Sequence, residues 1–277
     1  MQETYCCRMA PSIGKLEAEP GEIWGTKDYD PSTDKELPTV FFGLYGLPDF
    51  FELWRHRGKR FVFWAGTDIT HFKNGYWLDD EGEISVNPNV LARWLNENCE
   101  HWVENEVEAM ALRMLGISPK VCPSFLGDVS KFQIEFKSEE KIRLYTSVSG
   151  DNFKLYGWDE IPELARRNPD IELHLYGNTI PFLTAPNVVE HGRVPKEQMN
   201  EEIKSMTGAL RLTKFDGCSE LIVKAMLWGQ WPISPFIDYP YILKDLNELK
   251  SKRLPNIEGR NHYLKILNQF PWNNKKR

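Results

Sequence analysis

The sequence predicts an α/β protein in which helices cover both faces of parallel sheets. Strand-length apolar runs alternate with helical patterns along most of the 277 residues, and short connections join them. Parallel strands need crossover connections, and helices of this kind supply them. The alternation is interrupted once, near residue 130, and then starts again. We therefore expect two such sheets in tandem, with a cleft between them.

The first predicted domain spans residues 38–130 and follows an irregular lead-in, residues 1–37, which is rich in proline, glycine and charge. Its strands are short apolar runs, and its helices repeat apolar residues three or four positions apart. A proline near its start and a glycine after its end mark the first helix. In chain order the expected elements are a strand at 39–45, a helix at 48–57, a strand at 60–65, a helix at 88–98, a strand at 99–103 and a helix at 104–115.

The second predicted domain spans residues 131–277, and a charged stretch without a regular period, residues 123–140, links it to the first. Strands and helices alternate until about residue 234, and two helices close the chain. The expected strands are at 142–148, 171–176, 187–190, 209–212 and 232–234, with helices at 157–168, 195–206 and 219–228 between them and terminal helices at 239–251 and 258–269.

Composition and charge exclude several classes of protein. Apolar residues make up 41% and charged residues 27%, as in folded rather than disordered chains. The net charge of −6 provides no general attraction for a polyanion or an acidic membrane. No apolar run approaches the ~20 residues of a membrane helix, and no secretion signal begins the chain, so a cytoplasmic protein is expected. Five scattered cysteines without a CxxC pair favour a reducing compartment and no structural zinc.

Several catalytic motifs are absent from the sequence. It contains no GxxxxGK[ST], GxGxxG, HExxH or GxSxG pattern. These absences argue against P-loop ATPases, typical nicotinamide oxidoreductases, zincin proteases and α/β-hydrolases.

The most informative stretch is residues 210–234, where a turn joins a predicted strand to a predicted helix. The turn contains Asp216, Gly217 and Cys218, and Ser219 is a natural N-cap for the helix. A helix N-terminus presents unpaired N–H groups and about half a positive charge, which suits a diphosphate. Gly217 lets a ligand approach the backbone closely.

This stretch resembles the donor-site signature of retaining nucleotide-sugar glycosyltransferases of the GT-B fold, and family four in particular. In that signature an acidic residue and a glycine lead into a helix with Glu-Ala-Met and then Gly-x-Pro. The corresponding positions here read Asp216-Gly217-Cys218-Ser219, Lys224-Ala225-Met226 and Gly229-Gln230-Trp231-Pro232. Residues 63–68, 101–117, 158–177 and 191–195 resemble other segments of such enzymes. The resemblance implies two Rossmann-like domains, the first on the acceptor side and the second on the donor side.

The resemblance also implies roles for residues of the second domain. Asp216 would hold hydroxyls of the donor sugar, and the turn from Gly217 to Ser219 would hold its diphosphate. Lys154 is the basic residue suitably placed to reach that diphosphate, while Asp151 stands where a second basic residue is expected.

The loop with Gly192 and Arg193 would lie beside the base of the nucleotide. Arg193 either contacts phosphate or base through its planar guanidinium or is a surface residue.

One position departs from the family pattern. The family has two acidic residues eight positions apart, the second receiving the ribose hydroxyls, whereas this sequence has Asp216 and Lys224. An ammonium only donates hydrogen bonds, so Lys224 cannot replace a carboxylate unchanged. Either the ribose is held otherwise, or Lys224 meets a phosphate, or nucleotide binding is impaired. Glu220, one helical turn earlier, either forms an i,i+4 ion pair with Lys224 or binds the ribose itself.

In the first domain, the loop after the strand at 60–65 holds further candidates. Family members often place a histidine in this loop against the transferred sugar, but here Gly66 and Thr67 occupy the loop. Asp68 and His71 are therefore the candidates for contact with the sugar or the acceptor. Their alternatives are a helix-capping role for Asp68 and a plain surface position for His71.

The predicted function is transfer of a sugar, as in hexosyltransferases, from a nucleotide-diphosphate sugar to an acceptor with retention of anomeric configuration and without a metal. The acceptor is a glycan, lipid, small molecule, protein or nucleic acid, and a lipid acceptor would place the protein at a membrane surface. Catalysis would rest on Asp216, Asp68 and Lys154 through positioning and electrostatic stabilisation of the leaving diphosphate. The alternative is a catalytically silent GT-B relative that acts as a sugar-binding or partner-binding subunit. A nucleotide-binding Rossmann-like protein of different chemistry ranks third.

Overall fold

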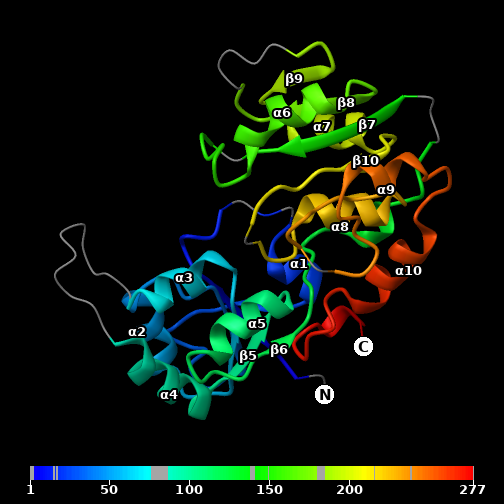
Figure 1. Ribbon diagram of the computed structural model, residues 1–277. Coiled ribbons are helices and arrows are strands. Elements are labelled where there is room, and N and C mark those ends of the chain that lie inside the picture. Colours follow the sequence, from blue (N-terminus) through cyan, green and yellow to red (C-terminus); the bar gives the residue numbers. More distant parts are fainter. Residues whose placement is uncertain are drawn as a thin grey trace. The chain divides into compact units, whose positions relative to one another are not determined.

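The computed structural model describes residues 3–14, 16, 18–75, 87–137, 141–148, 150–179, 185–214, 216–237 and 239–276. The chain divides into two compact α/β units (Figure 1). Unit 1 comprises Met1–Asp128 together with Ile266–Arg277, and unit 2 comprises Val129–Lys265. The C-terminal segment, expected in the second domain, therefore belongs to the first.

Unit 1 is built on a six-stranded parallel sheet in the order β2-β1-β3-β4-β5-β6. Its strands are β1 (Cys6–Met9), β2 (Lys27–Asp28), β3 (Thr39–Phe42), β4 (Arg60–Phe63), β5 (Glu100–Val103) and β6 (Lys120–Val121). Its helices are α1 (Pro20–Trp24), α2 (Leu47–Arg55), α3 (Thr67–Lys73), α4 (Pro88–Asn98) and α5 (Glu106–Arg113), with η3 (Asn274–Lys276) at the end of the chain.

Both faces of this sheet are covered, which explains why its strands read as continuous apolar runs. Successive residues of β3 point to opposite faces, and Phe41 and Phe42 belong to different core clusters. Helices α2 to α5 pack on the Phe41 face. On the Phe42 face, Trp24 of α1 meets Trp272 of the C-terminal segment at a ring-centroid distance of 6.0 Å.

The expectation of an irregular lead-in at residues 1–37 is wrong. β1 lies between β2 and β3, with Cys6 paired to Thr39 and both Cys6 and Cys7 buried. A four-residue strand is too short to show a period, and the proline, glycine and charge around it dominate the local composition. The pattern of the lead-in thus conceals a strand inside the first sheet.

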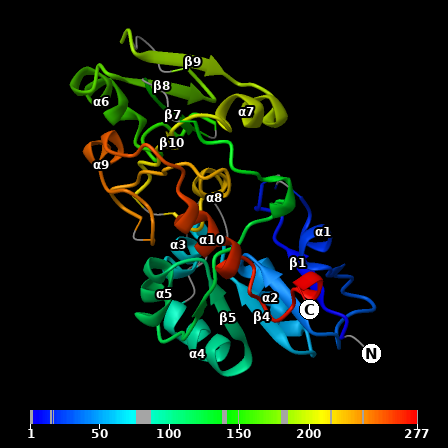
Figure 2. The ribbon, with the colours of Figure 1, turned by 90° about the vertical axis from the view of Figure 1, so that its right-hand side faces the viewer.

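Unit 2 contains a four-stranded parallel sheet in the order β10-β7-β8-β9 (Figure 2). Single parallel bridges from Leu210 to Ile233 and from Ile233 to Leu243 continue this sheet beyond β10. Its strands are β7 (Ile142–Ser147), β8 (Ile171–Tyr176), β9 (Val188–Gly192) and β10 (Gly208–Ala209). Its helices are η1 (Val129–Lys131), η2 (Trp158–Glu160), α6 (Ile161–Arg167), α7 (Lys196–Ile203), α8 (Glu220–Leu227), α9 (Leu246–Lys250) and α10 (Ile257–Ile266).

The predicted α/β class with parallel sheets is confirmed. Several elements of unit 2 are shorter than expected, and two examples show why. The strand at 232–234 is reduced to Ile233, which bridges Leu210 and Leu243, and α9 begins at Leu246 rather than near residue 239. Asp245 explains that start, because its carboxylate accepts from the N–H groups of Asn247 and Glu248 in a capping box. Within the described ranges, no helix is both long enough and apolar enough to cross a membrane.

Candidate functional site

The N-terminus of α8 is the centre of the site that the sequence predicts. Residues 221–227 of this helix are all buried, so the helix is fixed firmly in the core of unit 2. Ser219 is its N-cap residue, but the Ser219 hydroxyl makes no cap hydrogen bond, although only 9% of the residue is exposed. The N–H groups of a first helical turn have no intrahelical acceptor. This helix end therefore presents several hydrogen-bond donors around one hydroxyl.

A hydroxyl earlier in the same connection is buried without a partner among the described residues. Thr213, between β10 and the turn, is 3% exposed, and its Oγ1 bonds to no group in the part of the chain that the structure describes. Unsatisfied buried hydroxyls are rare in folded proteins. The unpaired Thr213 hydroxyl, a few residues before the uncapped Ser219, marks a polar region in this strand-to-helix connection that the protein leaves incomplete.

Asp216 is held by an arginine that the sequence analysis does not identify. Arg211 Nε donates to Asp216 Oδ2 at 2.6 Å, and the Arg211 guanidinium lies 4.5 Å from the centroid of the Tyr156 ring. Both side chains of the ion pair are mostly buried. The ion pair and the aromatic contact fix the direction of the Asp216 carboxylate. The spacing of five residues between Arg211 and Asp216 is the one signal in the sequence, and it is not specific.

Lys224, the departure from the family pattern, is a buried residue between α8 and α7. It is 4% exposed, and its Nζ lies 2.7 Å from Glu220 Oε1 and 3.0 Å from Asn200 Oδ1. Lys196 of α7 approaches the same Glu220 oxygen at 3.0 Å. Of the two alternatives for Glu220, the structure contains the ion pair. Two lysines therefore share one carboxylate in the first turn of α8.

Gly192 and Arg193 line a hollow of about 500 Å³ at the ends of β8 and β9. Arg193 Nε donates to Asn178 Oδ1 at 2.6 Å, and the Asn178 amide donates to Asp151. Asp151 thus fixes an asparagine that orients Arg193, although the family pattern has a basic residue there. Gly192 has φ +69°, and a Cβ there would meet nothing within 4 Å, so space is open above the backbone.

Topology brings these groups to one edge of the sheet. The loops after β7, β8, β9 and β10 carry, respectively, Lys154, Asn178, Arg193 and the turn to Ser219. Because these four strands are parallel, all four loops leave the carboxyl edge of the sheet. Lys154 is exposed in its loop.

The candidate loop of unit 1 differs from the sequence-based expectation at Asp68. The residue is fully buried, and its two carboxylate oxygens accept from the N–H groups of Leu44 at 2.9 Å and Ala65 at 3.0 Å. This burial raises the pKa of Asp68 to about 7, against the opposing effect of the N–H bonds. The carboxylate joins the loops after β3 and β4, so in this structure it positions them and presents no surface to a ligand.

The other residues of this loop gather around Tyr45, which the sequence analysis does not single out. Thr67 Oγ1 donates to the Tyr45 hydroxyl at 3.4 Å, and the exposed His71 lies edge-on to the Tyr45 ring at 5.8 Å. Gly66 is the N-cap of α3 with φ +89°, a conformation that favours glycine. Thr67 and His71 are therefore brought together, while Asp68 lies beneath them.

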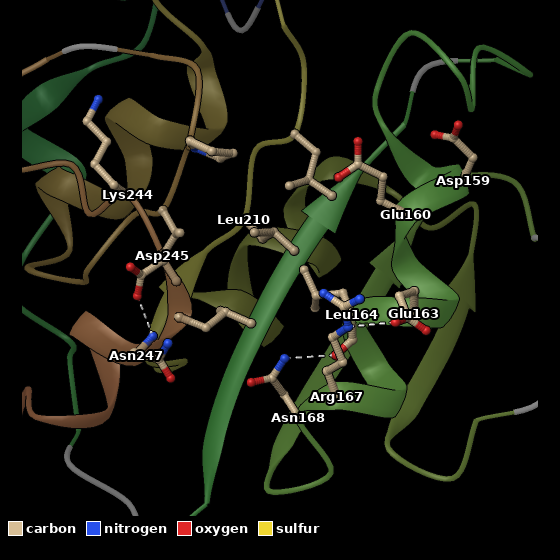
Figure 3. Close-up of a pocket in the computed structure, with 14 residues that line it drawn as sticks. Asp159, Glu160, Glu163, Leu164, Arg167, Asn168, Leu210, Lys244, Asp245 and Asn247 are labelled. Atoms are coloured by element: carbon tan, nitrogen blue, oxygen red, sulfur yellow. Dashed lines mark hydrogen bonds and ion pairs between the residues drawn. The ribbon is translucent and has the colours of Figure 1, made fainter.

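A different cavity of unit 2, of about 530 Å³, lies between α6 and the start of α9 (Figure 3). Its floor is apolar and includes Leu210, Leu212 and Ile233. Charged residues form its rim, with Glu163 and Arg167 paired to each other on one wall. None of the residues that the sequence analysis assigns to the site lines this cavity. Among the described residues, no group of three or more His, Cys, Asp or Glu side chains is arranged to hold a metal ion.

Solved structures resemble this chain over most of its length. A mutant of TarM from S. aureus, in complex with fondaparinux, α-GlcNAc-glycerol and UDP, has 12% identity and a TM-score of 0.54 over 82% of this chain and 52% of that one. Sucrose-phosphate synthase from Thermosynechococcus elongatus has 12% identity and a TM-score of 0.56 over 82% and 69%. HepE from Anabaena, in complex with UDP and glucose, has 10% identity and a TM-score of 0.51 over 99% and 98%.

These three proteins are GT-B glycosyltransferases. The fold of this chain is of the GT-B class. Identities of 10% to 12% establish the fold alone, and the chain spans about half the length of TarM. No protein-family model matches the sequence. No curated protein matches it either.

Proposed function

We propose that this chain is a glycosyltransferase that transfers a sugar from a nucleotide-diphosphate donor to an acceptor with retention of anomeric configuration. One observation carries the proposal: Ser219, about nine-tenths buried, is the N-cap residue of α8, and its hydroxyl makes no cap hydrogen bond to the helix. A phosphate oxygen at that place would accept from the hydroxyl and from the first-turn N–H groups. Gly217 would allow its close approach.

The proposed chemistry is stabilisation of the leaving diphosphate. Negative charge develops on the diphosphate as the bond to the sugar breaks, and the donors at Ser219 would stabilise it most in the transition state. Lys154 and Arg193 would add positive charge from the loops after β7 and β9. A phosphate oxygen of the donor would take the proton of the acceptor hydroxyl, so the protein supplies no nucleophile. No metal ion takes part in this scheme.

Recognition of the donor would use the groups that the structure fixes in advance. Asp216, oriented by Arg211, would accept from hydroxyls of the donor sugar. The hollow at Gly192 and Arg193 would hold the base. The TarM and HepE structures contain UDP, so a UDP-sugar is the first donor to test. In unit 1, Gly66, Thr67 and His71 would serve the acceptor side, with Asp68 holding their loop in place.

Thermal shifts with UDP, GDP, ADP and CDP test the donor site, and release of sugar from the matching nucleotide sugar tests catalysis. Ser219→Ala is the sharpest variant, because in the free protein it removes no cap hydrogen bond from α8. Its unfolding free energy should stay within about 0.5 kcal/mol of the wild type, while affinity for the nucleoside diphosphate falls about tenfold. An unchanged affinity would remove Ser219 from the site.

Ser234→Ala is the matched control. The Ser234 hydroxyl accepts from the N–H groups of Phe236 and Ile237, so its loss should lower stability and leave affinity unchanged. If none of the four nucleotides stabilises the wild type, the proposed function is wrong.

The second candidate function is a catalytically silent GT-B relative that binds a sugar or a partner protein. Lys224 favours this candidate, because it stands where the family pattern has the carboxylate that receives the ribose hydroxyls. Its ammonium is instead paired with Glu220. Stabilisation by a nucleotide without any sugar release or transfer would support this candidate over the enzyme.

A further inference from the structure

A row of hydrogen-bonded imidazoles and carboxylates crosses unit 2 from β8 through β9 to α7. Glu172 Oε1 lies 2.9 Å from His174 Nε2, and His174 Nδ1 lies 2.8 Å from His191 Nε2. His191 Nδ1 lies 3.3 Å from Glu202 Oε2 on α7. The Tyr176 hydroxyl donates to the same Glu202 oxygen at 2.8 Å, and the Tyr176 ring stacks on His191 at 4.2 Å between centroids. Figure 2 shows α7 beside β8 and β9.

These contacts determine where the protons of the two imidazoles lie. A carboxylate only accepts, so His174 Nε2 carries the hydrogen that faces Glu172. Burial lowers the pKa of His174, and a neutral His174 then offers a lone pair at Nδ1. His191 must therefore donate from Nε2. In a neutral His191 this leaves a lone pair at Nδ1 facing the Glu202 carboxylate, and a proton bound there turns that contact into a charge-assisted hydrogen bond.

The surrounding groups keep Glu202 charged. The Gln198 amide and the Tyr176 hydroxyl both donate to Glu202 and lower its pKa. On β7, the positive charge of Arg143 acts against a proton on His174. Lys141, just before β7, pairs with Glu172 and lowers the pKa of that carboxyl. His191 is the outer imidazole of the row, and its side chain is 21% exposed.

This row ends directly at the candidate donor site. His191 precedes Gly192, Tyr176 precedes Gly177, and the N–H of Gly177 donates to the Gly192 carbonyl at 2.9 Å. Both glycines line the hollow that contains Arg193. Any change in how His191 is held therefore acts on the backbone that forms the hollow.

We propose that His191 is a positioning residue for donor binding: with a proton on Nδ1 it ties Glu202 of α7 to the Gly192 loop, and the donor binds this form more tightly. A loop already held in place loses less conformational freedom when the ligand binds. The proposed contact requires a hydrogen on Nδ1, since the Glu202 carboxylate only accepts, and the protonated form of the imidazole supplies it while Nε2 faces His174. The inference rests on the proposed donor site and adds a pH dependence to it.

The experiment measures the affinity of the full chain for UDP-glucose, GDP-mannose and ADP-glucose between pH 5.5 and 8. The diphosphates of these donors do not titrate in that range. We expect at least about fivefold weaker binding at pH 8 than at pH 5.5 in the wild type. His191→Gln and Glu202→Gln should each remove this dependence. His262→Gln, on α10 and in contact with Tyr241 and Tyr263, should retain it.

¹⁵N NMR of the histidine side chains follows the proton directly and needs no ligand. It should show His191 as the imidazole that gains a proton at Nδ1, with Glu202→Gln weakening that gain. Binding that is equally tight at every pH, or a pH dependence that survives in His191→Gln, would overturn the inference alone. No binding of any donor at any pH would instead overturn the proposed function on which it rests.

Discussion

Replacing Asp68 by asparagine should change how the stability of the protein depends on pH. The folded carboxyl binds its proton more tightly than the unfolded one, because burial raises its pKa from 3.8 to about 7. Its contribution to the unfolding free energy is fully present below pH 3.8 and is lost as pH rises through about 7. At about 1.4 kcal/mol for each pH unit, the full effect is on the order of 4 kcal/mol.

The asparagine also carries a cost that does not depend on pH. Asp68 accepts from the N–H groups of Leu44 and Ala65 through separate oxygens, whereas an amide has one oxygen and presents an NH₂ group to the other donor. Leaving one buried N–H unpaired costs about 1 to 3 kcal/mol. The variant should therefore be less stable than the wild type at pH 5, and this difference should shrink by up to about 1.4 kcal/mol per pH unit towards pH 7.

Urea unfolding at pH 5, 6, 7 and 7.5, followed by tryptophan fluorescence, measures both effects. Trp24, Trp64 and Trp272 are fully buried in unit 1 and report its unfolding. Comparing variant with wild type at each pH cancels the titration of other groups. Asp170→Asn is the control, because Lys250 lowers the pKa of this exposed carboxyl and the pH 5 to 7 slope should not change. A stability difference that is the same at pH 5 and pH 7.5 would refute the reasoning.

Three further outcomes are expected. Gly177→Ala should destabilise the protein by about 2 kcal/mol or more, since φ is +121° and a Cβ would lie 2.5 Å from the Val148 carbonyl oxygen. Gly192→Ala should cost about 1 kcal/mol, because a Cβ there meets nothing within 4 Å. Denaturant unfolding measures both free energies. Glu220→Ala should lower the unfolding free energy by about 1 to 2 kcal/mol, because the buried Lys224 loses its carboxylate. Lys224→Met should be nearly neutral. Equal losses of stability in the two variants, measured by calorimetry, would contradict this. Transfer activity should survive EDTA, since lysine, arginine and helix donors meet the diphosphate charge; a loss restored by Mg²⁺ would show that a metal takes part.

The sequence predicts most of the elements because their apolar residues repeat with a clear period. β7, β8 and α8 appear at or close to their expected bounds for this reason. β1 is missed because four residues cannot show a period, and its place in the sheet depends on pairing with β3, more than thirty residues later. The return of the C-terminal segment to unit 1 is likewise set by packing, through Phe270 and Trp272 against Trp24.

The candidate site is predictable where local chemistry defines it and not where contacts between loops do. Ser219 as the start of α8 follows from the turn residues before it and the apolar helix after it. Asn178 connects Asp151 to Arg193 across three loops, and no spacing in the sequence indicates this contact. Asp68 is typical of a first helical turn in sequence, yet its burial depends on how the ends of β3 and β4 pack around it.

The most direct test of the account is a crystal structure of the protein with the nucleoside diphosphate that stabilises it most. The account predicts a phosphate within hydrogen-bond distance of the Ser219 hydroxyl and the first-turn N–H groups of α8, with the base in the hollow beside Gly192 and Arg193. A nucleotide bound elsewhere on unit 2, with no phosphate near the Ser219 hydroxyl, would contradict it.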